Sequence, residues 1–322
     1  MKRGQAMKNE NIAKNKFDED LLEIRKTILN NLKSTEKNSA KLMDNLAADK
    51  GKMLRALFVL IGGSFGNIDR KKLIEMASAI ELLHLATLVH DDIIDEANYR
   101  RGKSTIHSSY GVKAGIFTGD YLFAQSYVLF SKNVSPKSII EVSNTIKTIC
   151  VGEINQFFSV FSLESDIKSY LKRINGKCAS LFSLSLAIGA YEGNADKAII
   201  KKLKSIGYYT GMAFQLIDDI LDITSETNFL GKPSGNDIKE GIYTLPLLYE
   251  IKNSNNLIIE NLRNGSTEKV IEILRTSEGL TKAKETAKKY TFKSLKLIES
   301  LPDGFEKSYL NQIVEKMLVR EY

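Results

Sequence analysis

The sequence is poor in proline. Pro136, Pro233, Pro246 and Pro302 are its only prolines among 322 residues, whereas average usage would give about sixteen. Because proline interrupts helices, long helices are permitted along nearly the whole chain. Apolar residues make up 43% and charged residues 26% of the sequence. This composition is typical of a globular protein and excludes disorder of the whole chain.

Cysteine is scarce too, and long hydrophobic runs are missing. Cys150 and Cys178 are too few and too far apart for a disulfide framework or a CxxC metal site, which fits a reducing compartment and a cytoplasmic location. The longest uncharged run, residues 178–191, has 14 residues, and a membrane helix needs about 20. We therefore expect no membrane-spanning segment. Residues 1–16 are basic without the apolar core of a signal peptide, so we expect a flexible tail.

Apolar residues recur at helical spacing. From Phe17 to Leu32 they step by three or four residues, and the same stripe returns over residues 280–301, before a final helix to about residue 320. Further helices are predicted over residues 71–98, 117–131, 137–162, 167–190 and 196–224. Alternating strand patterns are scarce and no Pro, Gly or Ser-rich linker interrupts the chain. The sequence thus predicts one all-α domain of ten or more helices over residues 17–322.

Two glycine-containing segments mark expected breaks in this helical pattern. Gly62 and Gly63 form no phosphate-binding loop and are predicted to end a helix. Residues 225–241 form the longest stretch without a helical pattern. Long loops in compact domains are often functional.

Two aspartate triplets stand out on apolar helices. Each is a DDxxD sequence, and together they comprise Asp91, Asp92, Asp95, Asp218, Asp219 and Asp222. On a helix the outer aspartates of a triplet lie about 6 Å apart along the axis, so the carboxylates converge. One such triplet is a weak signal because surface helices are often acidic, but its repetition favours a metal site. Hard oxygen ligands and substrate phosphates suit Mg²⁺.

Basic residues accompany both triplets. Arg100 and Arg101 follow the first, Lys232 follows the second, and Lys177 lies between the two. Arginine forks and lysine ammonium groups bind phosphate oxygens, so the sequence predicts a site for a metal-bound diphosphate. The net charge of +7 would also allow a helical nucleic-acid-binding protein. The sequence has no recognisable nucleic-acid-recognition motif, and the acidic triplets would repel a phosphate backbone.

Further motifs occur in a fixed order around the triplets. DKGKMLRALFVL, ELLHLATLVHDD, KRINGKCASLF and FQLIDDILD follow one another along the chain. From about residue 17 to residue 322 this arrangement resembles the trans-prenyltransferase family, the isoprenyl diphosphate synthases. The resemblance implies an all-helical fold built around a prenyl pocket, three Mg²⁺ ions bound by the two triplets, and isopentenyl and allylic diphosphates as substrates.

The resemblance also implies roles for individual residues. Catalytic roles fall on Lys177, Gln215 and Arg100. Substrate-binding roles fall on Lys52, Arg55, His84, Arg100, Arg101, Lys177, Gln215 and Lys232. The first two of these, with His84 and Arg101, would hold isopentenyl diphosphate. The family is usually homodimeric, and a heterodimer with a small non-catalytic subunit is the other arrangement that we expect. Membrane contact would be peripheral at most, for product release.

The chain departs from the family pattern at several positions. Cys178 replaces a threonine, and Lys50, Ala56 and Ser104 replace a glycine and two prolines. In DIKEGIYTLP, Ile242 replaces a lysine, which removes one phosphate contact of the pattern, although a lysine lies three residues away. None of the six aspartates is missing. We therefore expect a catalytic chain and not an inactive regulatory subunit.

The implied reaction is ionisation of an allylic diphosphate, attack of the isopentenyl double bond on the allylic cation, and loss of a proton. Mg²⁺ with Lys177, Lys232 and Arg100 would neutralise charge on the departing diphosphate. Water must be excluded because it would quench the cation. The departing diphosphate is the expected proton acceptor, so no general base is assigned.

Small residues near the first triplet bear on product length. Ala86 and Thr87 lie five and four residues before Asp91, about 6–7.5 Å along the axis and on roughly the same face. Short-chain members of the family tend to carry an aromatic at the fifth position. Alanine here implies a deeper floor of the prenyl pocket, near Leu83 or Ile80 or on a neighbouring helix such as the one that contains Leu122 and Phe123. A small residue can also serve helix packing alone. We predict an all-trans product of hexaprenyl to octaprenyl length for a quinone side chain, with geranylgeranyl diphosphate as the alternative.

One alternative enzyme class and four other residues were also considered. A class I terpene cyclase shares the first triplet, but its second metal motif normally contains Asn, Ser or Thr ligands at a different spacing. His90 and His107 lack the HExxH spacing of zinc sites and are predicted to be neutral hydrogen-bonding residues. Tyr208 and Tyr209 are predicted to pack in the core.

Overall fold

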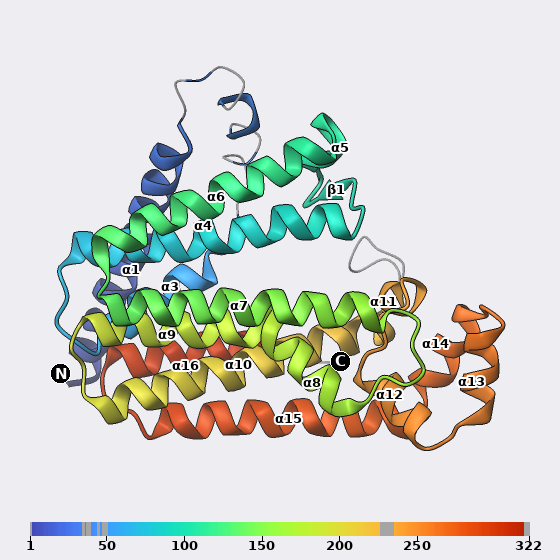
Figure 1. The fold of residues 1–322 in the computed structure, drawn as a ribbon. Helices are drawn as coiled ribbons and strands as arrows, with labels where there is room; N and C mark the ends of the chain where they lie inside the picture. The colour runs from blue at the N-terminus through green and yellow to red at the C-terminus, as the bar shows by residue number, and fades with distance from the viewer. Residues whose placement is uncertain are drawn as a thin grey trace. The chain divides into compact units, whose positions relative to one another are not determined.

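The computed structural model describes residues 2–33, 36, 40–43, 46, 51–225 and 235–318, with side chains from residue 16 onward. Helices dominate these residues, and the only strands among them are two of two residues each (Figure 1). The predicted all-α class is confirmed. The chain divides into two compact units, Met1–Ile140 with Ser185–Ile200, and Glu141–Leu184 with Lys201–Tyr322.

The first unit contains the N-terminal elements. These are α1 (Lys2–Leu32), α3 (Leu54–Gly63), α4 (Arg70–Ile94), β1 (Tyr99–Arg100), β2 (Lys103–Ser104), α5 (Ile106–Tyr110) and α6 (Val112–Asn133). α7 (Pro136–Ser159) begins in this unit and α9 (Ser180–Glu192) ends in it.

The second unit contains most of α7 and the elements that follow. These are α8 (Ile167–Ile174), the π-helical turn η1 (Asn175–Ala179), α10 (Lys197–Thr224), α11 (Asn236–Lys239), α12 (Leu245–Lys252), α13 (Asn256–Arg263), α14 (Thr267–Arg275), α15 (Glu278–Glu299) and α16 (Phe305–Leu318).

The first unit is built around α4. It runs beside α6 (Figure 1) and also packs against α1 and α3. Ile80, Leu83 and Ala86 on α4 are fully buried. Gly119 of α6 permits close approach, because a Cβ atom there would lie 2.1 Å from Nε2 of His90. Among the described residues, α4 is the one helix whose length and composition would allow a membrane span, and in this unit it is the core helix.

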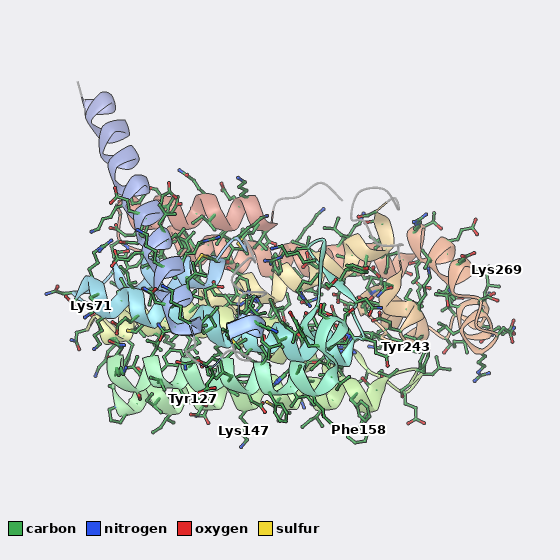
Figure 2. All side chains as sticks on the ribbon, turned by 90° about the horizontal axis from the view of Figure 1, so that it is seen from above. Lys71, Tyr127, Lys147, Phe158, Tyr243 and Lys269 are labelled. Atoms are coloured by element: carbon green, nitrogen blue, oxygen red, sulfur yellow. The ribbon has the colours of Figure 1, made fainter. Side chains whose placement is uncertain are left out.

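The second unit has its core on α10, α12 and α15. Leu216 and Ile220 of α10 are buried, and α12 packs along α15. A buried hydrogen bond of 2.7 Å joins the hydroxyls of Thr210 on α10 and Ser294 on α15. On α7, the side chain of Phe158 extends outward (Figure 2) and is 80% exposed.

Most of the predicted helices are confirmed, with shifted ends. The helix predicted over residues 167–190 is three consecutive elements, because η1 introduces a π-helical turn between α8 and α9. Gly63 ends α3 as predicted. The helix predicted over residues 280–301 is α15, whose Leu280, Ala283 and Ala287 are buried. The flexible tail expected over residues 1–16 stays a prediction.

Residues 225–241 were predicted to lack helix, and this prediction is wrong in part. α11 lies within this stretch. Its first turn is held by a residue distant in sequence, since Asp222 accepts hydrogen bonds from the backbone N–H groups of Asn236 and Asp237 at 3.3 and 3.4 Å. A four-residue helix fixed in this way has no periodic pattern of its own.

Candidate active site

The first aspartate triplet lies at the C-terminal end of α4. Asp91 and Asp92 belong to its last turn, and Asp95 is its C-cap residue. Asp92 is buried and accepts a 2.6 Å hydrogen bond from Nε of Arg100, while Asp95 is exposed. Burial raises the pKa of Asp92, although Arg100 acts in the opposite direction. In this structure the Asp92 carboxylate is therefore part of an ion pair with Arg100.

A tight hairpin places the two arginines that follow the triplet. β1 and β2 pair with Arg100 opposite Lys103, which leaves Arg101 and Gly102 as the turn. Both turn residues have positive φ, 50° and 79°, as a type I′ turn requires. Nη1 of Arg101 lies 2.8 Å from where a Cβ of Gly51 would be. The hairpin therefore brings Arg101 to the segment that precedes α3.

Three of the four residues predicted to bind isopentenyl diphosphate, Arg55, His84 and Arg101, come together in the first unit. Burial, with the positive charges of Arg55, Arg100 and Arg101, holds the pKa of His84 well below its usual range. His84 is therefore neutral and available for hydrogen bonding. Lys52 is exposed and lies just before α3. Three arginines around a neutral histidine form an anion-binding arrangement.

The second triplet lies on the last turns of α10, in the second unit. Asp219 is buried and accepts a 2.6 Å hydrogen bond from the Tyr170 hydroxyl and a 2.8 Å hydrogen bond from Nε2 of Gln215. Burial raises its pKa although both hydrogen bonds favour the charged form. Asp218 and Asp222 are half-buried. Gln215 thus contacts this triplet directly, and its catalytic and substrate-binding roles stay predictions.

A fourth carboxylate joins the second triplet. Burial and the charges of Asp219, Asp222 and Glu240 raise the pKa of Asp237 to about 8. Asp237 was not among the predicted site residues, although it is the first residue of the DIKEG segment. Its position next to the triplet depends on the chain turning back onto α10 at α11.

Arg173 and Tyr170 are further residues that sequence reasoning missed. Arg173 is buried, its Nη2 donates a 2.9 Å hydrogen bond to the carbonyl of Tyr243, and its guanidinium lies 5.2 Å from the Tyr170 ring centroid. Its charge acts on both Asp219 and Asp237. This buried cation offsets part of the carboxylate repulsion around the second triplet.

Lys177 lies on the π-helical turn η1. Its Nζ is 3.6 Å from Oε1 of Glu153 on α7. Gly176, next to Lys177, allows η1 to lie close to α7. A Cβ atom at Gly176 would lie 2.8 Å from the carbonyl oxygen of Thr148 on α7. π-Helical turns are frequent at functional sites. Lys232, the other lysine predicted to bind diphosphate, lies outside the described residues.

The donor chemistry of both triplets fits Mg²⁺. Among the described residues no three acidic, histidine or cysteine side chains already form a metal-ligand cluster. The triplets nevertheless supply hard carboxylate oxygens, which Mg²⁺ prefers. The charges of Asp219 and Asp222 raise the pKa of Asp237, and a divalent cation would relieve this repulsion.

The remaining candidates have structural contacts. His90 lies with Nε2 at 3.2 Å from the carbonyl of Ile116, and His107 has Nδ1 at 3.1 Å from the Thr105 hydroxyl, which confirms that both histidines form hydrogen bonds. The rings of Tyr208 and Tyr209 pack against each other at 5.3 Å and against Tyr290. Both tyrosines are half-buried and do not belong to the buried core, so the prediction of core packing is wrong in part.

The two residues predicted to control product length differ in burial. Ala86 is fully buried, while Thr87 keeps part of its surface exposed and donates a 2.7 Å hydrogen bond to the carbonyl of His84. Within the first unit, a larger side chain at Ala86 would therefore press on packed neighbours. A larger side chain at Thr87 would first fill accessible space.

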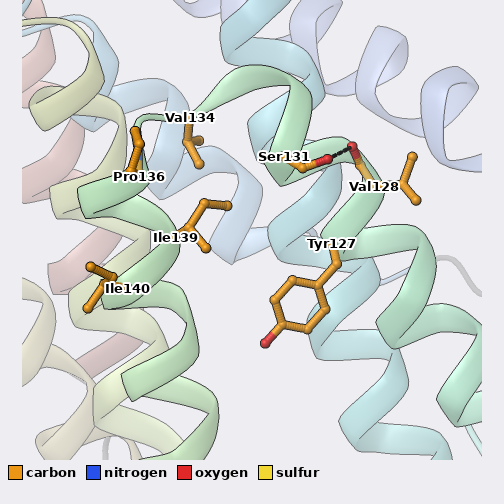
Figure 3. Close-up of a pocket in the computed structure, with 7 residues that line it drawn as sticks. All are labelled: Tyr127, Val128, Ser131, Val134, Pro136, Ile139 and Ile140. Carbon is orange, nitrogen blue, oxygen red and sulfur yellow. Dashed lines mark hydrogen bonds between the residues drawn. The ribbon is translucent and has the colours of Figure 1, made fainter.

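An apolar groove of about 630 Å³ lies in the first unit (Figure 3). The end of α6 and the start of α7 line it, with Tyr127, Val128 and Ile140 among its residues. No residue of either triplet lines this groove.

An all-α fold with one aspartate triplet ending α4 and a second ending α10 defines the class of trans-prenyltransferases. The family model described as polyprenyl synthetase matches residues 36–277. The chain belongs to this family, and it is an enzyme of the prenyltransferase class.

Three relatives give the scale of the similarity. The chain is 37% identical over 277 residues to heptaprenyl diphosphate synthase component 2 of Bacillus subtilis strain 168, covering 84% of this chain and 80% of the relative. It is 29% identical over 313 residues to octaprenyl diphosphate synthase of Haemophilus influenzae, covering 95% of each. The crystal structure of heptaprenyl diphosphate synthase from Staphylococcus aureus superposes with a TM-score of 0.89 at 36% identity, covering 94% of this chain and 98% of that one.

Proposed function

We propose that this chain condenses isopentenyl diphosphate with an allylic diphosphate to make a long-chain trans-polyprenyl diphosphate. The observation that carries the proposal is the cluster of Arg55, Arg100 and Arg101 around neutral His84, in the same unit as an aspartate triplet. Arginines bind diphosphate oxygens. A neutral histidine adds a hydrogen-bonding group without adding a further charge to the site.

The two triplets are the proposed ligands of Mg²⁺, three ions by resemblance. Bound Mg²⁺ would neutralise charge on the diphosphate as it leaves. Lys177 and Arg100 would bind oxygens of the same group, and Gln215 fixes the orientation of Asp219. Arg100 already holds Asp92, so metal or diphosphate binding must compete with this ion pair.

The product length that we propose is heptaprenyl to octaprenyl, for a quinone side chain. The names of the Bacillus and Haemophilus relatives support this range. The small side chains at Ala86 and Thr87 leave no aromatic close to the first triplet on α4. Geranylgeranyl diphosphate is the alternative product.

A second subunit is part of the proposal. On α6, Ile116 and Phe117 are 41% and 67% exposed, and on α7, Phe157 and Phe158 are 71% and 80% exposed. Where such side chains gather into a contiguous patch, they mark a protein contact. A second copy of this chain is the proposed partner. A small non-catalytic subunit is the alternative, which the two-component name of the Bacillus relative supports.

Cys150 and Cys178 are the two cysteines of the sequence, and so low a cysteine content supports a reducing, cytoplasmic location. We place the enzyme there, with membrane contact limited to product release.

The test is a pyrophosphate-release assay on the purified chain with isopentenyl and farnesyl diphosphates. Release is expected only with both substrates and Mg²⁺ present, and EDTA should abolish it. Release from the allylic substrate alone would indicate a cyclase or hydrolase. If the chain is inactive alone but active with a small second subunit, the two-component arrangement replaces the homodimer.

A further inference from the structure

Helix α3 begins without a cap of its own. Helix starts usually carry Ser, Thr, Asp or Asn at the N-cap, whose side chain accepts a hydrogen bond from the first turn. The N-cap of α3 is Met53, in a left-handed conformation with φ 50°, and its side chain makes no capping hydrogen bond in the described part of the chain. The backbone N–H groups of this first turn include that of Arg55.

A carboxylate from another helix takes the place of this cap. Oε1 of Glu81, on α4, accepts a 2.9 Å hydrogen bond from the backbone N–H of Ala56. The backbone N–H of Arg55 also donates to Glu81. A negative charge at a helix N-terminus is further stabilised by the helix dipole. Glu81 therefore fixes the first turn of α3 to α4.

The same carboxylate lies among the groups proposed to bind isopentenyl diphosphate. Burial raises the pKa of Glu81, and the positive charges of Arg55 and Arg101 act in the opposite direction. His84 is three residues further along α4, on the same face of the helix. One acidic side chain thus contacts or faces three of the residues in the anion-binding cluster.

We propose that Glu81 is a positioning residue for isopentenyl diphosphate. It holds the start of α3 so that Arg55 points into the cluster, and its charge keeps Arg55 and Arg101 together before substrate arrives. Glu81 itself touches no reacting atom. The inference rests on the proposed function, because it assigns Glu81 to one of the two substrates of that reaction.

The experiment compares Glu81→Gln with wild type. Glutamine keeps an oxygen that can accept the Ala56 hydrogen bond, but it removes the charge that organises the arginines. We expect the KM for isopentenyl diphosphate to rise roughly tenfold or more, as for loss of a hydrogen bond to a charged group. The KM for farnesyl diphosphate should stay within about twofold, and the Tm should change little. Glu81→Ala, which also removes the cap, should lower the Tm in addition.

Glu75→Gln is the matched control. Glu75 is on the same helix, and its carboxylate accepts a 2.7 Å hydrogen bond from Nδ2 of Asn133. This variant should leave both KM values unchanged. A Glu81→Gln enzyme with an unchanged KM for isopentenyl diphosphate, or with both KM values raised equally, would overturn the inference while the proposed function stands. A wild-type chain that releases no pyrophosphate from the two substrates would reject the proposed function itself.

Discussion

At the scale of single residues, the second triplet depends on the groups that hold its most buried carboxylate. Tyr170 donates to Oδ2 of Asp219, and Gln215 donates to Oδ1. Burial and Asp219 raise the pKa of Tyr170 well above its usual range, so the phenol keeps its proton and remains a donor. Residues that orient metal ligands in this way commonly change metal affinity when they are altered.

Tyr170→Phe should weaken Mg²⁺ binding. The variant removes one hydrogen bond to Asp219 without changing a residue of the triplet, and the expected loss of affinity is roughly 10–100-fold. Calorimetric titration of Mg²⁺ in the presence of inorganic pyrophosphate measures it independently of turnover. Tyr249→Phe is the control, because its hydroxyl lies 3.3 Å from the Thr286 hydroxyl, away from the triplet. Equal affinities in wild type and Tyr170→Phe would contradict this role.

Asp237 should make the metal-free protein less stable as the pH rises. Its pKa is about 8 in the folded chain, above the ordinary 3.8, so the folded state binds a proton that the unfolded state has released. The stability associated with that proton is present below about pH 4 and is lost as the pH rises to 8. In EDTA, Asp237→Asn should therefore lose less stability than wild type between pH 5 and 8, as followed by urea denaturation. Parallel curves for the two proteins would show that Asp237 ionises normally.

At the scale of elements, helix starts held by distant side chains recur in this fold. Glu192, the last residue of α9, accepts hydrogen bonds from the backbone N–H of Ser135 at 2.9 Å and from the Ser138 hydroxyl at 2.6 Å, at the start of α7. Lys72 on α4 lies 3.1 Å from the same carboxylate. Glu81 and Asp222 hold the starts of α3 and α11 in the same manner.

Glu192→Gln should destabilise the protein by about 1–3 kcal/mol, because it weakens several hydrogen bonds to a buried charge. Burial raises the pKa of Glu192, but the hydrogen bonds from Ser138 and Ser135 outweigh it, and the net shift is downward. The contribution of Glu192 is therefore present at neutral pH and is lost as the pH falls through its folded pKa. Denaturation at pH 7 and pH 3 should show a large difference between variant and wild type only at pH 7. A difference that persists at pH 3 would mean that packing, not charge, is responsible.

Sequence periodicity predicted the long helices because each has a repeating apolar face. It could not predict α11, whose start is fixed by Asp222, nor the fixing of α3 by Glu81. The six aspartates were identifiable because their spacing is local. Tyr170, Arg173 and Asp237 were not, since a single tyrosine, arginine or aspartate has no sequence signal, and only folding brings it to the triplet.

At the scale of the whole molecule, the length of the product shows whether side chains on α4 of the first unit limit elongation of the prenyl chain. Ala86→Phe inserts a large ring at a fully buried position on α4, whereas Thr87→Phe places it at a partly exposed one. If the growing chain extends along this face, Thr87→Phe should shorten the product and keep the Tm near wild type. Ala86→Phe should shorten the product and also lower the Tm, by overpacking of about 1–3 kcal/mol. Chromatography of the dephosphorylated products measures the product length of each variant. Unchanged product lengths in both variants would show that another part of the chain limits the length of the product.

The central claim is that the two aspartate triplets support condensation of two diphosphate substrates. The most direct measurement is mass spectrometry of the products made from isopentenyl and farnesyl diphosphates by wild type, Asp91→Asn and Asp218→Asn, each shown by circular dichroism to be folded. Wild type with Mg²⁺ should give heptaprenyl to octaprenyl diphosphate, and both variants should lose nearly all product. Near-normal product from either variant, or no elongation by the wild-type enzyme with any tested partner subunit, would contradict the account.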